Sequence, residues 1–311
     1  MSPFGPEVSC ACGGTVVLGD LSAARQAFLE EIKSKILWVK PRATLKESIR
    51  RNIDPTVSGA VSVADIDNAS SIRIAWAWAA RLPGVFALEK PEQDSGKSFQ
   101  FSVRDFLKKG FDLGRSVRPG DWQWKTECPA SRFDQYAHLN DIKDALDENR
   151  DLRTIFPEQY MVVPDIVVYR SPLMPAALGR STESDHSYMS PLVHEAAYAT
   201  GLPLLHASVS CKITMRSDRA QNTRTEALNL LRNRKGRAPA IVAVTAEPLP
   251  TRLASLALGT GDVDFVYHAA LPELRAAVAD SDNDDQADML TTLVEGRRLR
   301  DISDLVLDLL I

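Results

Sequence analysis

The chain has 311 residues, a formal net charge of −4 and an isoelectric point of about 5.8. Hydrophobic residues make up 44% and charged residues 25%, which excludes a disordered tail protein, a collagen-like fibre and a disulfide-stapled miniprotein. The mild acidity also excludes a uniformly basic coat protein for nucleic acid.

The N-terminus and the cysteines indicate the cellular compartment of the protein. Residues 1–20 contain glycine and proline and predict a flexible tail. The four cysteines, Cys10, Cys12, Cys128 and Cys211, match no paired zinc motif, and the first residues lack the basic and apolar regions of a signal peptide. No run reaches the roughly 18 apolar residues of a membrane helix. We therefore expect a cytoplasmic protein with reduced cysteines and no membrane partner.

Helical spacing of apolar residues predicts most elements of the first half. This spacing runs over residues 21–53, 68–82, 99–111 and 140–155. Basic side chains decorate the first of these segments, and they fit either a solvated helix face or contacts to phosphate. The sequence RPGDW, residues 118–122, predicts a turn that leads into a strand.

Strands alternate with helices in the second half. The predicted strands cover residues 160–169, with a proline inside, 204–213, 241–246 and 263–268. The predicted helices cover residues 218–234 and 251–258 and begin again at Pro272 and Gln286, and a loop over 171–203 holds a helical stretch near 192–199. No repeat or linker divides the chain. We expect one α/β domain over residues 21–311, with a mixed central β-sheet flanked by α-helices.

Two predicted strands carry residues that point to chemistry. Asp165 follows Pro164 on the first strand, and the second strand ends in Ser210, Cys211 and Lys212. Alternate residues of a strand share a face, so Ser210 and Lys212 point one way and Cys211 points the other. A carboxylate beside a lysine on a neighbouring strand is the arrangement of a hydrolytic metal site, in which the lysine stabilises charge that develops on a phosphate.

A second carboxylate is expected two residues before the lysine, but Ser210 stands there. Glu226, on the following predicted helix, is the candidate replacement. It shares one helix side with Arg219, Asn222 and Asn233, and that side is too polar for a core. The alternative is an exposed helix glutamate that pairs with a neighbour such as Asn222, and the spacing alone favours this alternative.

The turn between that strand and that helix is rich in charge. Its sequence, MRSDRAQN, contains Arg216, Asp218 and Arg219 at a helix N-terminus. Arginines match O6 and N7 of guanine, and an aspartate accepts from N4 of cytosine, when a helix end faces the major groove. The same residues also fit a helix capped by Ser217 or Asp218 with solvated arginines. Residues 205–237 hold eight basic and two acidic residues, which favours DNA.

One long stretch and several short motifs carry a resemblance to a known family. The stretch is HASVSCKITMRSDRAQNTRTEALNLLRNRKGRAP at residues 206–239, and the motifs are RPGDW at Arg118, QYAHL at Gln135, PDIVV at Pro164, VTAEPLPTR at Val244, ALGTG at Ala257 and RLRDISDLVLDL at Arg298. They resemble the type IIF restriction endonucleases of the PD-(D/E)XK superfamily that cut GCCGGC. The resemblance covers residues 55–311.

The resemblance implies a restriction-endonuclease-like core and a set of catalytic residues. It implies that Asp165, Glu226 and the backbone of Cys211 hold Mg²⁺, that Lys212 is the catalytic lysine, and that Ser210 stands where related nucleases keep the acid. The second carboxylate then comes from Glu226 on the helix and not from position 210 on the strand. The resemblance therefore favours a functional role for Glu226 over an exposed helix glutamate.

The resemblance also implies which residues read the DNA bases. The residues that correspond to readers of a CCGG core are Arg216, Asp218 and Arg219. Asp65, in the segment SVADIDNAS, matches the reader of the outer G·C pair, and Gln93 matches a glutamine that reaches the minor groove.

Position 100 departs from the family. In the segment SGKSFQ, Gln100 stands where the family carries a further glutamate near the metal. A glutamine orients water but adds no negative charge. Asp105 does not replace it, because five residues along a helix turn a side chain about 140° away.

Two hypotheses of different classes follow. The first is a Mg²⁺-dependent type II restriction endonuclease that cuts double-stranded DNA at a palindrome with a CCGG core, acts as a homodimer or as a homotetramer of two back-to-back dimers, and shares its cell with a cognate DNA methyltransferase. The second is a cleavage-deficient or weakly active DNA-binding protein with the same fold. It is motivated by Gln100, which replaces an acid of the family. A repair nuclease is disfavoured, because such enzymes read DNA structure and need no base-reading turn.

Overall fold

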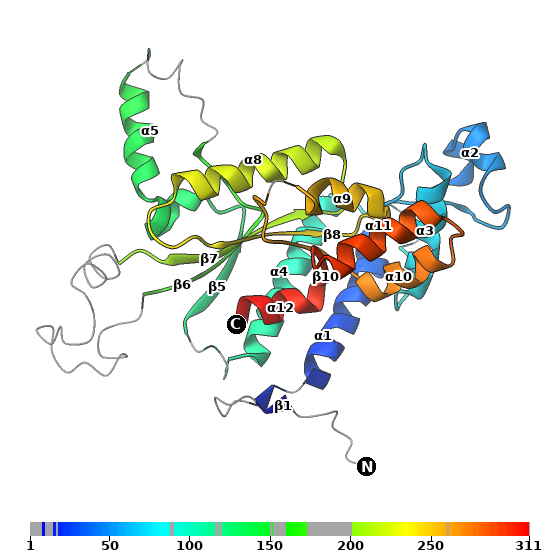
Figure 1. Cartoon of the computed structure of the whole chain (residues 1–311), viewed down its shortest axis with the longest axis horizontal. Coiled ribbons are helices and arrows are strands. Elements are labelled where there is room, and N and C mark those ends of the chain that lie inside the picture. Colours follow the sequence, from blue (N-terminus) through cyan, green and yellow to red (C-terminus); the bar gives the residue numbers. More distant parts are fainter. Residues whose placement is uncertain are drawn as a thin grey trace, which may run out of the picture.

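A mixed sheet forms the centre of the molecule (Figure 1). The computed structural model describes residues 8–9, 15–16, 18–87, 90–115, 118, 120–149, 151, 160–172, 201–259 and 261–310. In this part of the chain, six strands pair in the order β10-β9-β8-β7-β6-β5. They are β5 (Trp122–Thr126), β6 (Ile166–Arg170), β7 (Leu204–Lys212), β8 (Ala240–Thr245), β9 (Phe265–His268) and β10 (Leu299–Asp301). Strands β5 to β7 pair antiparallel and β7 to β10 pair parallel.

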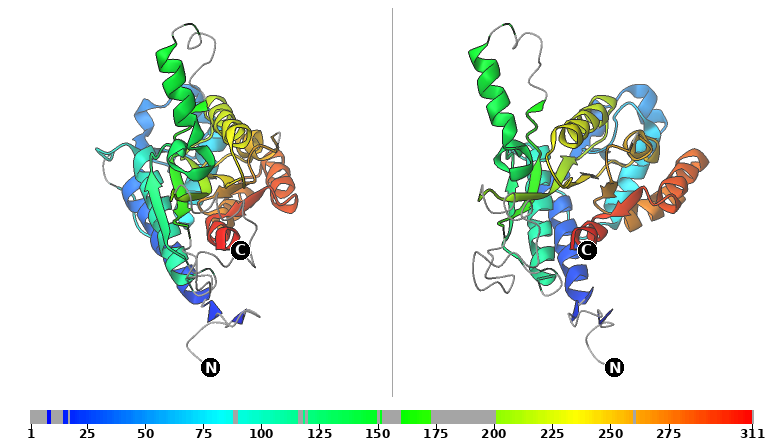
Figure 2. Two further views of the ribbon diagram at one scale, coloured as in Figure 1. Left: turned by 90° about the vertical axis from the view of Figure 1, so that its left-hand side faces the viewer. Right: turned by 60° about the vertical axis from the view of Figure 1, so that its left-hand side comes forward.

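Helices cover both faces of this sheet, as the predicted fold class requires (Figures 1 and 2). They are α1 (Leu18–Glu31), α2 (Glu47–Arg51), α3 (Ala69–Arg81), α4 (Ser95–Leu113), α5 (His138–Glu148), α8 (Ser217–Asn233), α9 (Pro250–Ala257), α10 (Leu271–Ala279), α11 (Asp284–Glu295) and α12 (Ile302–Leu310). Helix α5 extends away from the rest of the molecule in all three views. None of the helices in the described ranges is long and apolar enough to span a membrane.

The strand alternation of β6 explains how two cores form on opposite faces. Ile166 and Val168 are buried in the large core with helix α4, whereas Val167 and Tyr169 are buried in a smaller core with helix α8. Successive residues of a strand point to opposite faces, so an uninterrupted apolar run produces a strand that is covered on both sides. Helix α8 is thereby fixed over the same strands that carry the predicted site.

The prediction of one helical segment over residues 21–53 was wrong beyond Ile36. Helix α1 passes into a π-helical segment, Ile32–Ile36, and the chain then forms β3 (Val39–Pro41), which pairs antiparallel with β4 (Gly59–Val61). Pro41 lacks the N–H that a continuing helix needs and disfavours helical backbone before it. Lys33 does not lie on a solvated face either, because it is buried and its ammonium donates to the carbonyl of Leu82 at 2.8 Å.

Other boundaries also differ from the expectations. Strand β6 begins at Ile166, later than predicted, because Pro164 has no N–H to donate to a sheet ladder. Within residues 1–20, α1 already begins at Leu18, and two-residue strands β1 (Val8–Ser9) and β2 (Thr15–Val16) pair. The helical stretch predicted near 192–199, together with Cys10 and Cys12, lies outside the described residues.

The close contact between β3 and β4 leads to a first prediction. A Cβ on Gly59 would collide with the backbone carbonyl of Lys40, and the Gly59 carbonyl itself accepts from Trp76 Nε1 at 2.7 Å. We expect Gly59→Ala to lower the free energy of unfolding by about 1–3 kcal/mol, since neither backbone can retreat without breaking the pair. Chemical denaturation measures this loss. Gly236→Asn is the control, because Gly236 has a φ of 76° that asparagine tolerates and open space around it.

Candidate active site

Neighbouring strands bring Asp165 and Lys212 into contact, as predicted. Asp165 directly precedes β6 and Lys212 ends β7, and Lys212 Nζ lies 2.8 Å from Asp165 Oδ2. The backbone N–H of Cys211 donates to the same oxygen at 2.7 Å, and Ser210 Oγ lies 3.4 Å from it. The side chain of Cys211 points the other way and is buried in the large core. The alternation of residues 210–212 therefore holds.

The side chain of Gln100 binds the backbone of Asp165. It lies buried on α4, and its amide Nε2 donates to the carbonyl oxygen of Asp165. The N–H of Glu127 donates to that carbonyl as well, at 3.1 Å. An ionised glutamate at position 100 has no hydrogen to donate and would repel the carbonyl. Glutamine at this position thus fixes the backbone of Asp165, which is a role that the sequence did not suggest.

Glu226 lies on α8, near Asp165 and Lys212. Thr223, nearly one helical turn before it, approaches Ser210 with 3.2 Å between the two hydroxyl oxygens, which anchors α8 over the end of β7. Burial raises the pKa of Glu226, the charge of Lys212 lowers it, and the charge of Asp165 raises it. Among the described residues no hydrogen bond or ion pair is made by its side chain, so the pairing with Asn222 that the alternative interpretation required is absent there.

The donor set at this end of β7 fits a hard cation. Asp165 and Glu226 supply carboxylate oxygens, and the half-buried Glu226 is near the charge of Lys212 but forms no ion pair among the described residues. A group of three or more His, Cys, Asp or Glu side chains that alone suffices for a metal does not occur in the described ranges. Mg²⁺ suits such a site, because it keeps several waters and binds through one or two carboxylates. Soft metals that need sulfur or imidazole fit poorly.

A basic cleft leads from this site to the predicted base-reading turn. The cleft has a volume of about 530 Å³, and five of the predicted residues line it: Gln93, Cys211, Lys212, Arg216 and Arg219. Lys40 and Lys90 add positive charge to its wall, and Glu92 and Asp94 offset part of this charge. Such a concentration of cations beside two carboxylates is the electrostatic setting for a bound polyanion.

The turn itself is built to present its charged side chains. Helix α8 begins at Ser217 with Arg216 as its N-cap, and no side-chain cap bond forms there, so neither Ser217 nor Asp218 is the N-cap. Arg216 and Asp218 are exposed. Arg219 donates to Thr214 at 2.6 Å on its hydroxyl and 3.2 Å on its carbonyl, which folds the turn back on itself. The arrangement leaves Arg216 and Asp218 free to contact a ligand.

Asp65 does not line this cleft, but a chain of contacts connects it to the turn. It forms an ion pair with Arg252 of α9, and Arg252 Nη1 lies 4.0 Å from Glu247 Oε2. Glu247 in turn accepts from the backbone N–H of Met215 at 2.8 Å. Sequence reasoning missed Arg252 and Glu247. The available clue was a lone acid inside the apolar segment that follows the predicted strand 241–246.

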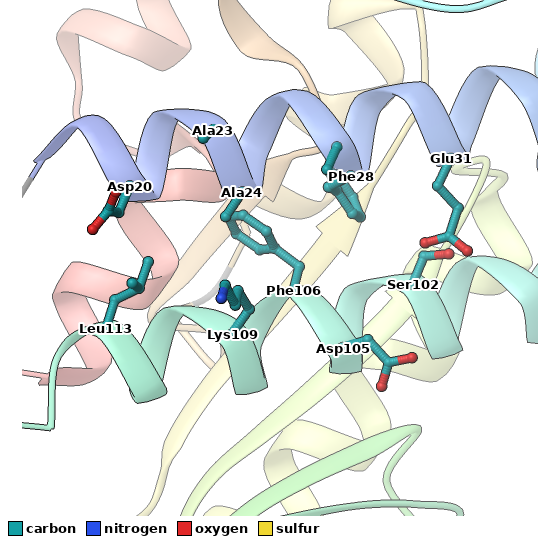
Figure 3. Close-up of a pocket in the computed structure, with 11 residues that line it drawn as sticks. Asp20, Ala23, Ala24, Phe28, Glu31, Ser102, Asp105, Phe106, Lys109 and Leu113 are labelled. Carbon is teal, nitrogen blue, oxygen red and sulfur yellow. The ribbon is translucent and has the colours of Figure 1, made fainter.

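A hollow between α1 and α4 lies apart from the cleft (Figure 3). Its apolar lining includes Ala24, Phe28, Phe106 and Leu113. Asp105 is one of the residues that line this hollow, on a different side of α4 from Gln100, as helical geometry predicts for a residue five positions further along. None of the predicted site residues lines this hollow, whereas five of them line the basic cleft.

Comparisons with known proteins identify the family of this chain. Residues 42–311 match the NgoMIV restriction enzyme family. The chain is also 43% identical over 257 residues to the type II restriction enzyme NgoMIV of Neisseria gonorrhoeae, an alignment that covers 81% of this chain and 90% of that enzyme. Both matches include the strands and the helix that carry Asp165, Lys212 and Glu226. The chain belongs to the NgoMIV restriction enzyme family.

Proposed function

We propose that this chain is a type II restriction endonuclease that hydrolyses double-stranded DNA at a palindrome with a CCGG core, GCCGGC in the simplest case, with Mg²⁺ as cofactor. The observation that carries the proposal is the 2.8 Å contact between Asp165 and Lys212, the lysine of which lines a basic cleft. Membership of a restriction enzyme family supplies the substrate class, and the charged turn at Arg216 supplies groups that read guanine and cytosine.

Each residue at the end of β7 has a distinct task in this proposal. Asp165 and Glu226 would hold the cation, which when bound stabilises negative charge on the phosphate and acidifies water. Lys212 places an ammonium beside the scissile phosphate, where it offsets charge that develops during attack. The N–H of Cys211 and the amide of Gln100 keep Asp165 in position. Ser210 connects the carboxylate to α8 through Thr223.

Base reading falls to residues along the cleft and at its edge. Arg216 and Arg219 would contact guanine, Asp218 would accept from cytosine, Asp65 would read the outer base pair, and Gln93 would reach the minor groove. A palindrome presents the same half-site twice, so a two-fold homodimer is the minimal active unit, and two back-to-back dimers make a homotetramer. We place this enzyme in the cytoplasm with a DNA methyltransferase that protects the host's own sites.

Digestion of DNA of known sequence tests the proposal. With Mg²⁺, we expect discrete fragments whose sequenced ends all fall within one palindrome and carry CCGG overhangs. Fragment ends without a common sequence would contradict specific recognition. A mobility shift on the palindrome without any nicking would instead favour the cleavage-deficient DNA-binding protein. Gln100 alone does not favour that alternative, because its amide has a defined partner in the carbonyl of Asp165.

A further inference from the structure

Glu247 is a fully buried carboxylate outside the catalytic cluster. Its exposed fraction is 0%, and it lies between the end of β8 and the start of α9. Both of its oxygens accept backbone hydrogen bonds: Oε2 from Met215 at 2.8 Å and Oε1 from Leu249 at 3.1 Å. A buried carboxylate is costly unless such donors satisfy it, so its presence needs a reason.

The partners of Glu247 connect two segments that the proposed function assigns to base reading. Met215 directly precedes Arg216 in the turn that leads into α8. On the other side, Arg252 Nη1 lies 4.0 Å from Glu247 Oε2, and Nη2 of the same guanidinium pairs with Asp65. One carboxylate thus joins the turn at Met215 to the Asp65 loop, although 150 residues of sequence separate Asp65 and Met215.

The chain around Glu247 is rigid, so Glu247 positions its partners and is not positioned by them. Pro248 and Pro250 flank Leu249, and residues 246–250 are all buried. Prolines fix the backbone torsion φ and reduce the freedom of such a segment. The carboxylate is therefore held at a set place, and the turn at Met215 and the guanidinium of Arg252 are positioned against it.

We propose that Glu247 is a positioning residue for DNA sequence discrimination: it fixes the turn at Met215 and the Arg252–Asp65 pair relative to each other without contacting DNA or metal. The inference rests on the proposed function. Hydrogen bonds to base edges weaken steeply with small changes of distance and angle, so a displaced turn loses specific contacts before it loses contacts to phosphate.

The test compares discrimination with catalysis in Glu247→Gln. Glutamine has the same shape, but it has no charge for Arg252 and only one oxygen for two backbone donors. Affinity is measured in Ca²⁺ and single-turnover cleavage in Mg²⁺, on the site that the wild type cuts and on duplexes with one base pair replaced in each half-site. We expect the preference for the wild-type site to fall about 10-fold, as for loss of one charge-assisted hydrogen bond, and the cleavage rate at saturation to stay within about 3-fold.

Asp301→Asn is the matched control. Asp301 is also a buried acid that accepts a backbone N–H, from Leu271 at 2.9 Å, and pairs with an arginine, Arg25 at 2.8 Å, but none of its partners belongs to a reading segment. We expect this variant to lower the melting temperature and to leave the preference among duplexes unchanged. Glu247→Gln with a similar loss of stability and wild-type preference would overturn the inference.

A second variant serves if Glu247→Gln does not fold. Arg252→Lys keeps both backbone bonds of Glu247 but replaces the guanidinium that contacts both acids. It should weaken preference at the outer base pairs and spare the core, and equal loss at every position would count against the inference. Failure of the proposed function is distinguishable, because the wild type itself would then cut no palindrome.

Discussion

Replacement of Lys212 by alanine is expected to abolish detectable cleavage, with a loss of about 100- to 1,000-fold or more, while specific binding in Ca²⁺ persists. Lys212 Nζ contacts Asp165 at 2.8 Å and lines the basic cleft, and its charge also lowers the pKa of Glu226, so its ammonium acts on both candidate metal ligands. Binding depends on many other cations and on the reading turn, which the substitution leaves in place. Plasmid digestion in Mg²⁺ and a mobility shift in Ca²⁺ measure the two effects separately.

A control for Lys212→Ala comes from the same strand–helix unit. Lys235 follows α8, is exposed, and lines a pocket with Leu204 and Leu205 at the start of β7, the strand end opposite to Lys212. Lys235→Ala removes an equal charge, and we expect it to retain cleavage within about 3-fold, as for an exposed charge far from the reaction. Undiminished cleavage by Lys212→Ala would contradict the assignment of this lysine and of the site around it.

The segment from β7 to β8 was predictable because local patterns determine it. An apolar strand, a turn rich in charge and an amphipathic helix follow one another without interruption, and the structure places β7, α8 and β8 within a few residues of the expected bounds. The contact between Asp165 and Lys212 followed from strand pairing. In contrast, β3, β4 and β10 have three residues each, and so short a run gives no periodic pattern.

Contacts between distant residues were beyond what the sequence pattern predicts. The chain of contacts from Met215 through Glu247 and Arg252 to Asp65 depends on how α9 packs against the loop before α3. The role of Gln100 was missed for a related reason: its partner is a backbone oxygen, which no residue type reveals. From side-chain types alone, Gln100 is interpreted as the loss of an acid. In the structure, its amide donates a hydrogen bond to the backbone of Asp165.

Local charge explains why the whole-chain value was uninformative. Residues 205–237 hold eight basic and two acidic residues, whereas residues 263–311 hold eleven acidic and four basic residues. Several of those acids are engaged within the fold: Glu273 and Asp301 pair with Arg25, and Asp308 pairs with Arg300. None of these three acids lines the cleft, so they do not offset the positive charge of its wall.

Glu226→Gln is expected to lose cleavage by at least about 100-fold and, unlike most substitutions at partly buried sites, not to destabilise the metal-free protein. Burial raises the pKa of Glu226 although the nearby charge of Lys212 opposes this shift, and among the described residues its side chain makes no hydrogen bond or ion pair. Glutamine removes that desolvated charge and its repulsion with Asp165 but keeps the shape, so folding without metal should become equally or more favourable.

The comparison with Asp165→Asn makes this prediction specific to the cation. Asp165 accepts from Cys211 and Lys212 in the metal-free protein, so Asp165→Asn should lose both cleavage and stability. Melting temperatures with and without Mg²⁺ measure the difference, since a ligand that binds only the folded state raises the melting temperature. The wild type should show such a rise and Glu226→Gln should not. A Glu226→Gln protein that still gains stability from Mg²⁺ would place the cation elsewhere, and Glu226 would then be no metal ligand.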